Sequence, residues 1–464
     1  MKDNVKRLAT VIIAGFFLLA VYLAYIQFYQ ADRLFSHPKN QRLARWEETT
    51  LRGGIYGRNG EVLADTVAAD GALHRVYPQG TAFAGVTGYN SARFGKSGLE
   101  AEYNEYLLGL NKGERILNTI RRLEGKQPQG NSLKLTIDVC LQAQAMKLLG
   151  NRKGAVVALD PSTGEILALV SSPSYNPEAV DMLWPQLSKD PNSPLLNRAL
   201  QGLYPPGSIF KVVTGSAALV NSKDSYERSY YCPGYIDIQG RRLNCIKVHG
   251  QVDFREAMAY SCNVYFAQSA LETGSQFFLQ MAGNFGLNGQ LSFDLPLTKS
   301  KIPTLAQLNL NELAESAIGQ GKVLVTPLQM ALVAATIAND GVMMHPFLVK
   351  EIRSPADKVL FANTPTPLLT PVDRNTAGLI KTAMFGVVDF GTGGAAAVSG
   401  VRVAGKTGSA QNPHGLAHAW FIGFAPLEHP RVAVAVVVEN GGAGGVVSAP
   451  IARDLMVQVL VNER

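Results

Sequence analysis

Cysteine, tryptophan and histidine are scarce in this chain of 464 residues, which holds 4, 3 and 7 of them. No two cysteines have the Cys-x-x-Cys spacing that is typical of zinc sites, so we expect no metal and no cofactor. Charged residues make up only 17% of the chain, and the net charge of +7 is spread along it without a cluster of lysine and arginine. A nucleic-acid partner is therefore not expected.

Charge is missing altogether from Leu8 to Ala31, which follows the basic residues Lys2, Lys6 and Arg7. About 20 apolar residues span a bilayer, and no small-x-small cleavage site closes this run cleanly. We therefore expect an uncleaved transmembrane helix in a cell membrane protein. The basic flank is expected to stay in the cytoplasm, which places Asp32 and everything after it outside. A buried core helix is the alternative.

Outside the membrane, the four cysteines could form disulfides. Cys232 and Cys245 bracket a short segment that contains glycine, and they are the plausible pair by proximity. We interpret Cys140 and Cys262 as free, packed thiols.

Three regions follow one another along the chain. Residues 1–31 hold the cytoplasmic N-terminus and the anchor, and residues 32–150 are expected to form a polar stalk and a small pedestal domain. In the pedestal, Arg52 to Ala64 has an Asn-Gly turn between apolar runs, which predicts a hairpin. Residues 151–464 have strand patterns at 155–159, 166–170, 401–404, 419–424 and 432–439, with helical patterns between them, including 254–271. This order predicts an α/β (α+β) domain with one sheet built from both ends of the region.

The first candidate for chemistry is Ser208, which follows a Pro-Pro-Gly turn at what is predicted to be the start of a helix. Lys211 lies three residues further on, and positions i and i+3 share one face of a helix. A serine next to an uncharged lysine in a dry site is a known form of activated nucleophile. Alone the pattern is weak, because both residue types are common.

Two further motifs follow Ser208 in the same predicted domain. Ser261-Cys262-Asn263 offers a hydroxyl and a carboxamide two residues apart, and Lys406-Thr407-Gly408-Ser409 offers a cation and hydroxyls beside a strand. Ser174-Tyr175-Asn176 and Lys96-Ser97-Gly98 match parts of these patterns elsewhere. Only the first set has the order Ser-x-x-Lys, Ser-x-Asn, Lys-Thr-Gly, which is the combination found in β-lactamases and penicillin-binding proteins.

With these motifs the chain resembles the class B penicillin-binding proteins, which are single-pass peptidoglycan D,D-transpeptidases. The resemblance covers nearly everything after Arg52, although Gly57 stands where the family usually has an acidic residue. The fold it implies is a penicillin-binding/β-lactamase-like transpeptidase domain with an antiparallel sheet flanked by helices, together with a small N-terminal pedestal and one transmembrane helix. The matching segments are 52–64, 95–100, 135–138, 197–211, 319–330, 405–411 and 418–421.

The resemblance also implies a role for each motif residue. Ser208 would attack the penultimate D-alanine carbonyl of a stem peptide, with Lys211 as base, Ser261 as proton relay and Asn263 holding Lys211 and the substrate backbone. Lys406 and the hydroxyls of Thr407 and Ser409 would bind the terminal carboxylate, next to Gly408. The backbone N–H groups of Ser208 and Ser409 would form the oxyanion hole.

Other activities remain open beside transpeptidation of stem peptides. A β-lactamase or a D,D-carboxypeptidase would share the acylation step, and a β-lactam sensor or a division scaffold would keep the motifs with little turnover. The space before residue 150 is too small for a glycosyltransferase domain. The resemblance implies β-lactam antibiotics as inhibitors. It also implies a separate partner, a polytopic glycan polymerase of the SEDS type, in contact with Tyr22 to Tyr29 and with the pedestal around Arg52 and Arg58.

Overall fold

Five strands rich in alanine and β-branched residues form one antiparallel sheet in the order β17-β18-β19-β7-β8. Two of them begin the predicted large domain and three end it, so the prediction of one sheet built from both ends is confirmed. The computed structural model describes residues 2–30, 46–413 and 415–461. The strands are β7 (Gly154–Leu159), β8 (Ile166–Ser172), β17 (Ala404–Ala410), β18 (His418–Ala425) and β19 (Val432–Val438).

Both faces of this sheet are covered by helices, so every residue of β19 is buried. Successive side chains of a strand point to opposite faces. Val157 of β7 accordingly joins the core under α16 (Pro327–Ala338), whereas Val156 joins a second core under α8 (Val139–Leu149) and α18 (Gly444–Val461). The strand order makes β17 an edge strand of the sheet, and it packs against the segment Gly207–Phe210.

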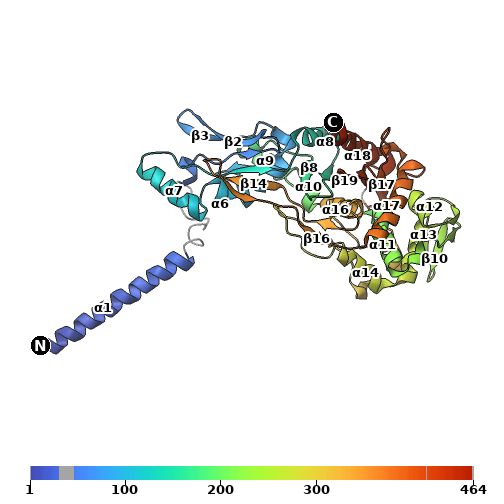
Figure 1. Cartoon of the computed structure of the whole chain (residues 1–464), viewed down its shortest axis with the longest axis horizontal. Coiled ribbons are helices and arrows are strands. Elements are labelled where there is room, and N and C mark those ends of the chain that lie inside the picture. Colours follow the sequence, from blue (N-terminus) through green and yellow to red (C-terminus); the bar gives the residue numbers. More distant parts are fainter. Residues whose placement is uncertain (1, 31–45, 414, 462–464) are drawn as a thin grey trace.

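The region between β8 and β17 supplies most of the helices. Figure 1 shows the helices α12 to α14 gathered at one end of the body and the early strands β2 and β3 at the other. The helices of this region are α9 (Val180–Leu187), α10 (Arg198–Gln201), α11 (Lys211–Asn221), α12 (Phe254–Ala259), α13 (Asn263–Thr273), α14 (Ser275–Asn284), α15 (Leu310–Ala317), α16 and α17 (Arg374–Asp389). Short strands lie among them: β9 (Tyr230–Cys232) pairs with β12 (Gly250–Val252), β10 (Tyr235–Ile238) with β11 (Arg241–Asn244), and β13 (Met343–Met344) with β16 (Pro367–Leu369).

A second sheet of six strands forms the pedestal, in the order β15-β14-β6-β1-β2-β3. The predicted hairpin is present, because β1 and β2 are antiparallel neighbours. Two strands of this sheet come from much later in the chain, so residues 349–362 complete a domain that begins near residue 52. The division near residue 150 remains a prediction. The strands are β1 (Ile55–Tyr56), β2 (Val62–Ala69), β3 (Ala72–Val76), β6 (Ser132–Leu135), β14 (Val349–Arg353) and β15 (Val359–Ala362).

Small helices and one short strand pair complete the pedestal: α4 (Ala84–Thr87), α5 (Gly98–Glu102), α6 (Asn104–Leu107), α7 (Lys112–Leu123), β4 (Asn90–Ser91) and β5 (Gly95–Lys96). Glu100 of α5 is fully buried and contacts two arginines: Arg52 Nε lies 2.5 Å from one carboxylate oxygen, and Arg75 Nε lies 2.7 Å from the other. This network ties the segment before β1 to β3 and α5.

Helix α1 (Lys2–Tyr25) has 24 residues and none of them is buried. At 1.5 Å per residue it is about 36 Å long, enough to cross a bilayer. Figure 1 shows it standing apart from the body. Helix α18 is also long and apolar enough to span a bilayer, but it is partly buried against the central sheet. The predicted stalk lies mostly in residues 31–45, outside the described residues.

Two local differences from the sequence prediction concern the motifs. The helical pattern predicted over 254–271 is interrupted after Ala259, and Ser261 adopts a positive φ of 58° in the break. The strand predicted at 401–404 instead starts at Ala404 and carries Lys406 to Ser409 within it. The motif side chains are therefore positioned by a break between two helices in one case and by an edge strand in the other. The periodicity of apolar residues in the sequence does not indicate either feature.

Candidate active site

Ser208 lies in a tight turn that leads directly into α11. The turn includes the 3-10 segment Gly207–Phe210, and Ser208 itself is half-buried. Gly207 has a φ of +56°, a left-handed conformation that favours glycine. Its N–H donates to the carbonyl oxygen of Gly319 at 2.8 Å. A Cβ on Gly319 would lie 2.1 Å from the Gly207 carbonyl oxygen, so only glycine fits there without a shift.

Lys211 is fully buried, and its Nζ is held by the second motif. The amine donates to the carbonyl oxygen of Ser261 at 2.8 Å, to the Ser261 Oγ at 3.2 Å and to the Asn263 Oδ1 at 2.7 Å. Burial lowers the pKa of Lys211 to about 8, although the nearby thiols of Cys245 and Cys262 act in the opposite direction. At pH 7 about one amine in ten is then neutral, and this fraction grows as the pH approaches 8.

Lys406 reaches the same serine from the edge strand β17. Its Nζ donates to the Ser261 Oγ at 2.9 Å and to the Thr407 carbonyl oxygen at 3.0 Å, and its side chain is fully buried. Burial and the charge of Lys211 hold the pKa of Lys406 well below its usual value. The three predicted motifs thus meet at the hydroxyl of Ser261.

A cleft of about 870 Å³ opens in front of these groups. Among the predicted site residues, the cleft lining contains Ser208, Ser261, Asn263, Thr407, Gly408 and Ser409. Lys211 and Lys406 lie beneath the lining and contact it through Ser261. The structure therefore brings all eight predicted residues together.

Sequence reasoning missed two neighbours of the site. Thr392 lines the cleft, and its hydroxyl lies 2.7 Å from that of Thr407. Asn244 accepts a hydrogen bond from Asn263 Nδ2 at 2.9 Å through its carbonyl oxygen. Neither residue belongs to a recognisable local pattern. Both are brought to the site only by the tertiary fold.

One carboxylate, that of Glu315, occurs among the described residues that line the cleft. Its Oε1 lies 2.6 Å from Nη2 of Arg241, so the carboxylate is engaged in an ion pair at the rim. A water-activating base would need a carboxylate that is available to accept a proton.

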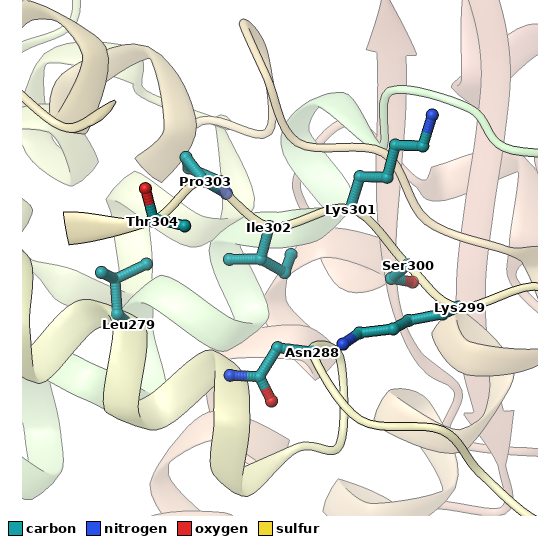
Figure 2. A pocket seen from close by; sticks show the side chains of 8 residues that line it. All are labelled: Leu279, Asn288, Lys299, Ser300, Lys301, Ile302, Pro303 and Thr304. Carbon is teal, nitrogen blue, oxygen red and sulfur yellow. The ribbon is translucent and has the colours of Figure 1, made fainter. Parts of the chain in front are cut away.

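A separate pocket of about 630 Å³ lies between α14 and residues 299–304. Figure 2 shows the apolar side chains of Leu279 and Ile302 in it, together with Asn288 and the two lysines Lys299 and Lys301. None of the predicted site residues lines this pocket.

The predicted disulfide between Cys232 and Cys245 is not formed in the structure, where all four cysteines are free thiols. The two sulfur atoms instead contact a third residue: Cys232 Sγ and Cys245 Sγ lie 3.5 and 3.4 Å from His249 Nδ1. Cys245 Sγ is also 3.8 Å from Cys262 Sγ. Cys262 is a free, buried thiol as predicted, whereas Cys140 is exposed rather than packed.

Comparison with known proteins agrees with this geometry. Residues 154–457 match the family model of the penicillin binding protein transpeptidase domain, and residues 52–133 match that of the penicillin binding protein A dimerisation domain. The chain belongs to the penicillin-binding proteins and is a serine-type D,D-transpeptidase of that family, as the sequence predicts.

Among its relatives is the peptidoglycan D,D-transpeptidase PbpA of Mycolicibacterium smegmatis, 36% identical over 98% of both chains. The peptidoglycan D,D-transpeptidase MrdA of Escherichia coli is 30% identical over 85% of this chain and 72% of the relative. The solved penicillin G acyl-enzyme complex of penicillin-binding protein A from Mycobacterium tuberculosis covers 89% of this chain and all of its own, with a TM-score of 0.83 and 34% identity.

Proposed function

We propose that this protein crosslinks the stem peptides of peptidoglycan through an acyl-enzyme on Ser208. The observation that carries the proposal is the position of Lys211, a fully buried amine joined to Ser261 and Asn263 at the floor of the cleft that Ser208 lines. A neutral amine at this place can accept the proton of a serine hydroxyl.

The reaction has two steps. Ser208 Oγ attacks the carbonyl carbon of the penultimate D-alanine while its proton passes to Lys211, and the C–N bond to the terminal D-alanine breaks. The leaving amine takes up a proton through Ser261, whose hydroxyl accepts hydrogen bonds from both buried lysines. The amine of a second stem peptide then attacks the ester, releases Ser208 and completes the crosslink.

The remaining site residues would bind the negatively charged groups of the substrate and of the reaction intermediate. Lys406, Thr407 and Ser409 suit the terminal carboxylate, because two hydroxyls lie on the edge strand together with an amine whose charged form a bound carboxylate would favour. Backbone N–H groups of Ser208 and Ser409 suit the developing oxyanion. Loss of one donor of this kind typically costs about 10² to 10³ in rate.

The alternatives differ in the fate of the acyl-enzyme. A β-lactamase must hydrolyse the ester quickly, and the carboxylate in the described lining of the cleft, Glu315, is already paired with Arg241. This favours a long-lived ester with β-lactams. A D,D-carboxypeptidase would release the acyl group to water, and a sensor or scaffold would not turn over a stem-peptide mimic.

The proposal is tested by intact-mass spectrometry of the full-length protein with penicillin, followed by peptide mapping. We expect one adduct, on Ser208, and none in Ser208→Ala. A stem-peptide mimic with an acceptor amine should then give the crosslinked product. An adduct on another residue would contradict the assignment of the nucleophile, and release of hydrolysed product alone would favour a carboxypeptidase.

For the cellular arrangement, we propose that α1 anchors the chain with its N-terminus in the cytoplasm and the catalytic domain outside. The basic residues before the apolar run support this orientation. We further propose a polytopic glycan polymerase of the SEDS type as partner, since crosslinking requires fresh strands and the described fold is accounted for by an anchor, a pedestal and a transpeptidase domain. Of the two arginines expected to contact the partner, Arg52 is buried against Glu100 and is unavailable, so it does not belong to the proposed contact surface. The Arg58 side chain is 30% exposed and remains in it.

The partner is tested by co-purification with the polymerase. Replacing residues 1–31 with an unrelated membrane helix, and separately Arg58→Ala, should each reduce recovery of the polymerase while acylation of Ser208 persists. Unchanged recovery in both variants would refute the partner without touching the catalytic assignment.

A further inference from the structure

Four side chains with metal-binding atoms converge behind the Ser-x-Asn motif. The sulfur atoms of Cys232, Cys245 and Cys262 and the imidazole of His249 all lie within 4.8 Å of one another. Cys232 ends β9, Cys245 follows β11, His249 precedes β12 and Cys262 caps α13. Because the four residues come from different elements, their spacing in the sequence does not reveal the cluster.

Three of the separations between the four ligand atoms match those of a tetrahedral zinc site, and the others lie within 4.8 Å. With Zn–S bonds of about 2.3 Å and Zn–N bonds of about 2.0 to 2.1 Å, tetrahedral angles place two sulfurs about 3.8 Å apart and a sulfur about 3.6 Å from the nitrogen. The structure has 3.8 Å between Cys245 Sγ and Cys262 Sγ, and 3.5 and 3.4 Å from His249 Nδ1 to Cys232 Sγ and Cys245 Sγ. A disulfide would instead need about 2.05 Å between two sulfurs.

The surroundings also suit thiolates. The backbone N–H of Asn263 donates to Cys245 Sγ at 3.1 Å, and that of Tyr265 donates to Cys262 Sγ at 3.5 Å. Both donors belong to the first turn of α13, where the helix dipole stabilises negative charge. The His249 ring stacks on Tyr260 with an interplanar angle of 16°, which fixes its direction.

We propose that Cys232, Cys245, His249 and Cys262 bind one structural zinc ion in a closed tetrahedral site. Three cysteines and one histidine are an established ligand set for structural zinc. The proposal replaces both the expectation of no metal and the predicted Cys232–Cys245 bridge.

The position of the site gives it a consequence for the catalytic groups. Cys262 is the middle residue of the Ser261-Cys262-Asn263 motif, and Cys245 directly follows Asn244, whose carbonyl oxygen holds the Asn263 side chain. A metal bound to both cysteines would therefore tie the β10–β11 hairpin to the motif and fix Ser261 and Asn263 against Lys211. This positioning role rests on the proposed function, whereas the metal site itself does not.

The metal is tested by elemental mass spectrometry of the full-length protein in detergent, after growth with zinc and exhaustive dialysis against metal-free buffer. We expect about one zinc per chain. Cys232→Ser and His249→Asn should each lose it, whereas the matched control Cys140→Ser should retain it, because Cys140 is an exposed cysteine on α8 and outside the cluster. A wild-type protein without zinc, or equal zinc in all four proteins, would overturn the proposal.

A second measurement uses the wild type alone, so it does not depend on the folding of variants. Alkylation of the native protein should modify only Cys140, and alkylation after chelation and denaturation without reductant should modify all four cysteines. Only two modified cysteines in the denatured sample would indicate a disulfide and contradict the zinc site. Replacement of zinc by cobalt should give the visible absorption of a tetrahedral cobalt thiolate.

The positioning role has its own readout. Chelated wild-type protein should acylate Ser208 more slowly with penicillin, and added zinc should restore the rate. If zinc is bound but its removal leaves the rate unchanged, the site is structural only and the positioning role is wrong. If Ser208 is never acylated, the proposed function fails while the zinc stoichiometry still decides the metal site.

Discussion

Lys211 and Lys406 are both fully buried, and both donate to the same acceptor, the Oγ of Ser261, at 3.2 and 2.9 Å. Two ammonium groups so close together repel each other, and burial penalises the charged form of each. Burial lowers the pKa of both lysines, and the charge of Lys211 lowers that of Lys406 further. In the proposed mechanism, Lys211 is the base on one side of Ser261, and Lys406 on the other side is an amine whose charged form an incoming carboxylate would favour.

The first prediction concerns the pH dependence of acylation. Lys211 must be neutral to accept the proton of Ser208, and its pKa of about 8 means that the neutral fraction rises with pH up to that value. The rate constant for acylation by penicillin should increase about tenfold per pH unit below the midpoint and level off above it. Stopped-flow measurements with a fluorescent penicillin from about pH 6 to about pH 9.5 would check this. A flat profile would exclude Lys211 as the base.

Ser261→Ala should slow acylation by about 10² to 10⁴, the usual contribution of a positioned proton-transfer group. The variant also removes an oxygen that accepts from the Lys211 ammonium, so the midpoint of the pH profile should move below that of the wild type. Ser174→Ala is the matched control, since Ser174 begins the other Ser-x-Asn sequence and its hydroxyl donates to the Thr81 carbonyl oxygen at 2.7 Å. Equal rates for the two variants would contradict the relay.

Lys406→Ala should weaken recognition of a carboxylate more than the chemistry itself. A hydrogen bond to a charged group contributes about 1.5 to 3 kcal/mol, which corresponds to about 10- to 150-fold in rate or affinity. The test compares acylation by a penicillin and by its methyl ester. The preference for the free acid should fall by that factor in the variant. An unchanged preference would show that another group binds the carboxylate.

The motif residues that the structure brings together could be found in the sequence because each motif is local, and their catalytic roles remain a proposal. Ser208 and Lys211 lie on consecutive turns, and Lys406 to Ser409 lie along one strand, so short spacing carries their geometry. The break at Ser261 depends on a positive φ, and its apolar neighbours gave no sign of it. Apolar periodicity describes which face is buried and not where the backbone turns.

Contacts between distant segments lie beyond such reasoning. Thr392 meets Thr407 only because α17 packs beside β17, and the cysteines meet only because two small strand pairs fold against α13. The pedestal likewise contains β14, whose partner β6 lies about 200 residues earlier, as the pairing of Ile352 with Leu133 shows. Local patterns cannot report partners at that separation.

The last prediction concerns the pedestal and is independent of catalysis. Burial opposes the charged form of Glu100, but the charges of Arg52 and Arg75 outweigh this and hold its pKa below the usual value. Arg52→Ala leaves this buried carboxylate with one arginine fewer, and breaking a buried pair typically costs about 3 to 5 kcal/mol. Chemical unfolding of the full-length protein should show a loss of that order.

Arg58→Ala is the control for this loss, because its pair with Glu165 is partly exposed and should contribute about 0 to 1 kcal/mol. Since the pKa of Glu100 is lower in the folded than in the unfolded state, its contribution to stability is present above the unfolded pKa and lost as pH falls through the folded one. The difference between wild type and Arg52→Ala should therefore shrink in acid. Equal losses for the two arginine variants at neutral pH would show that the buried network does not hold the pedestal together.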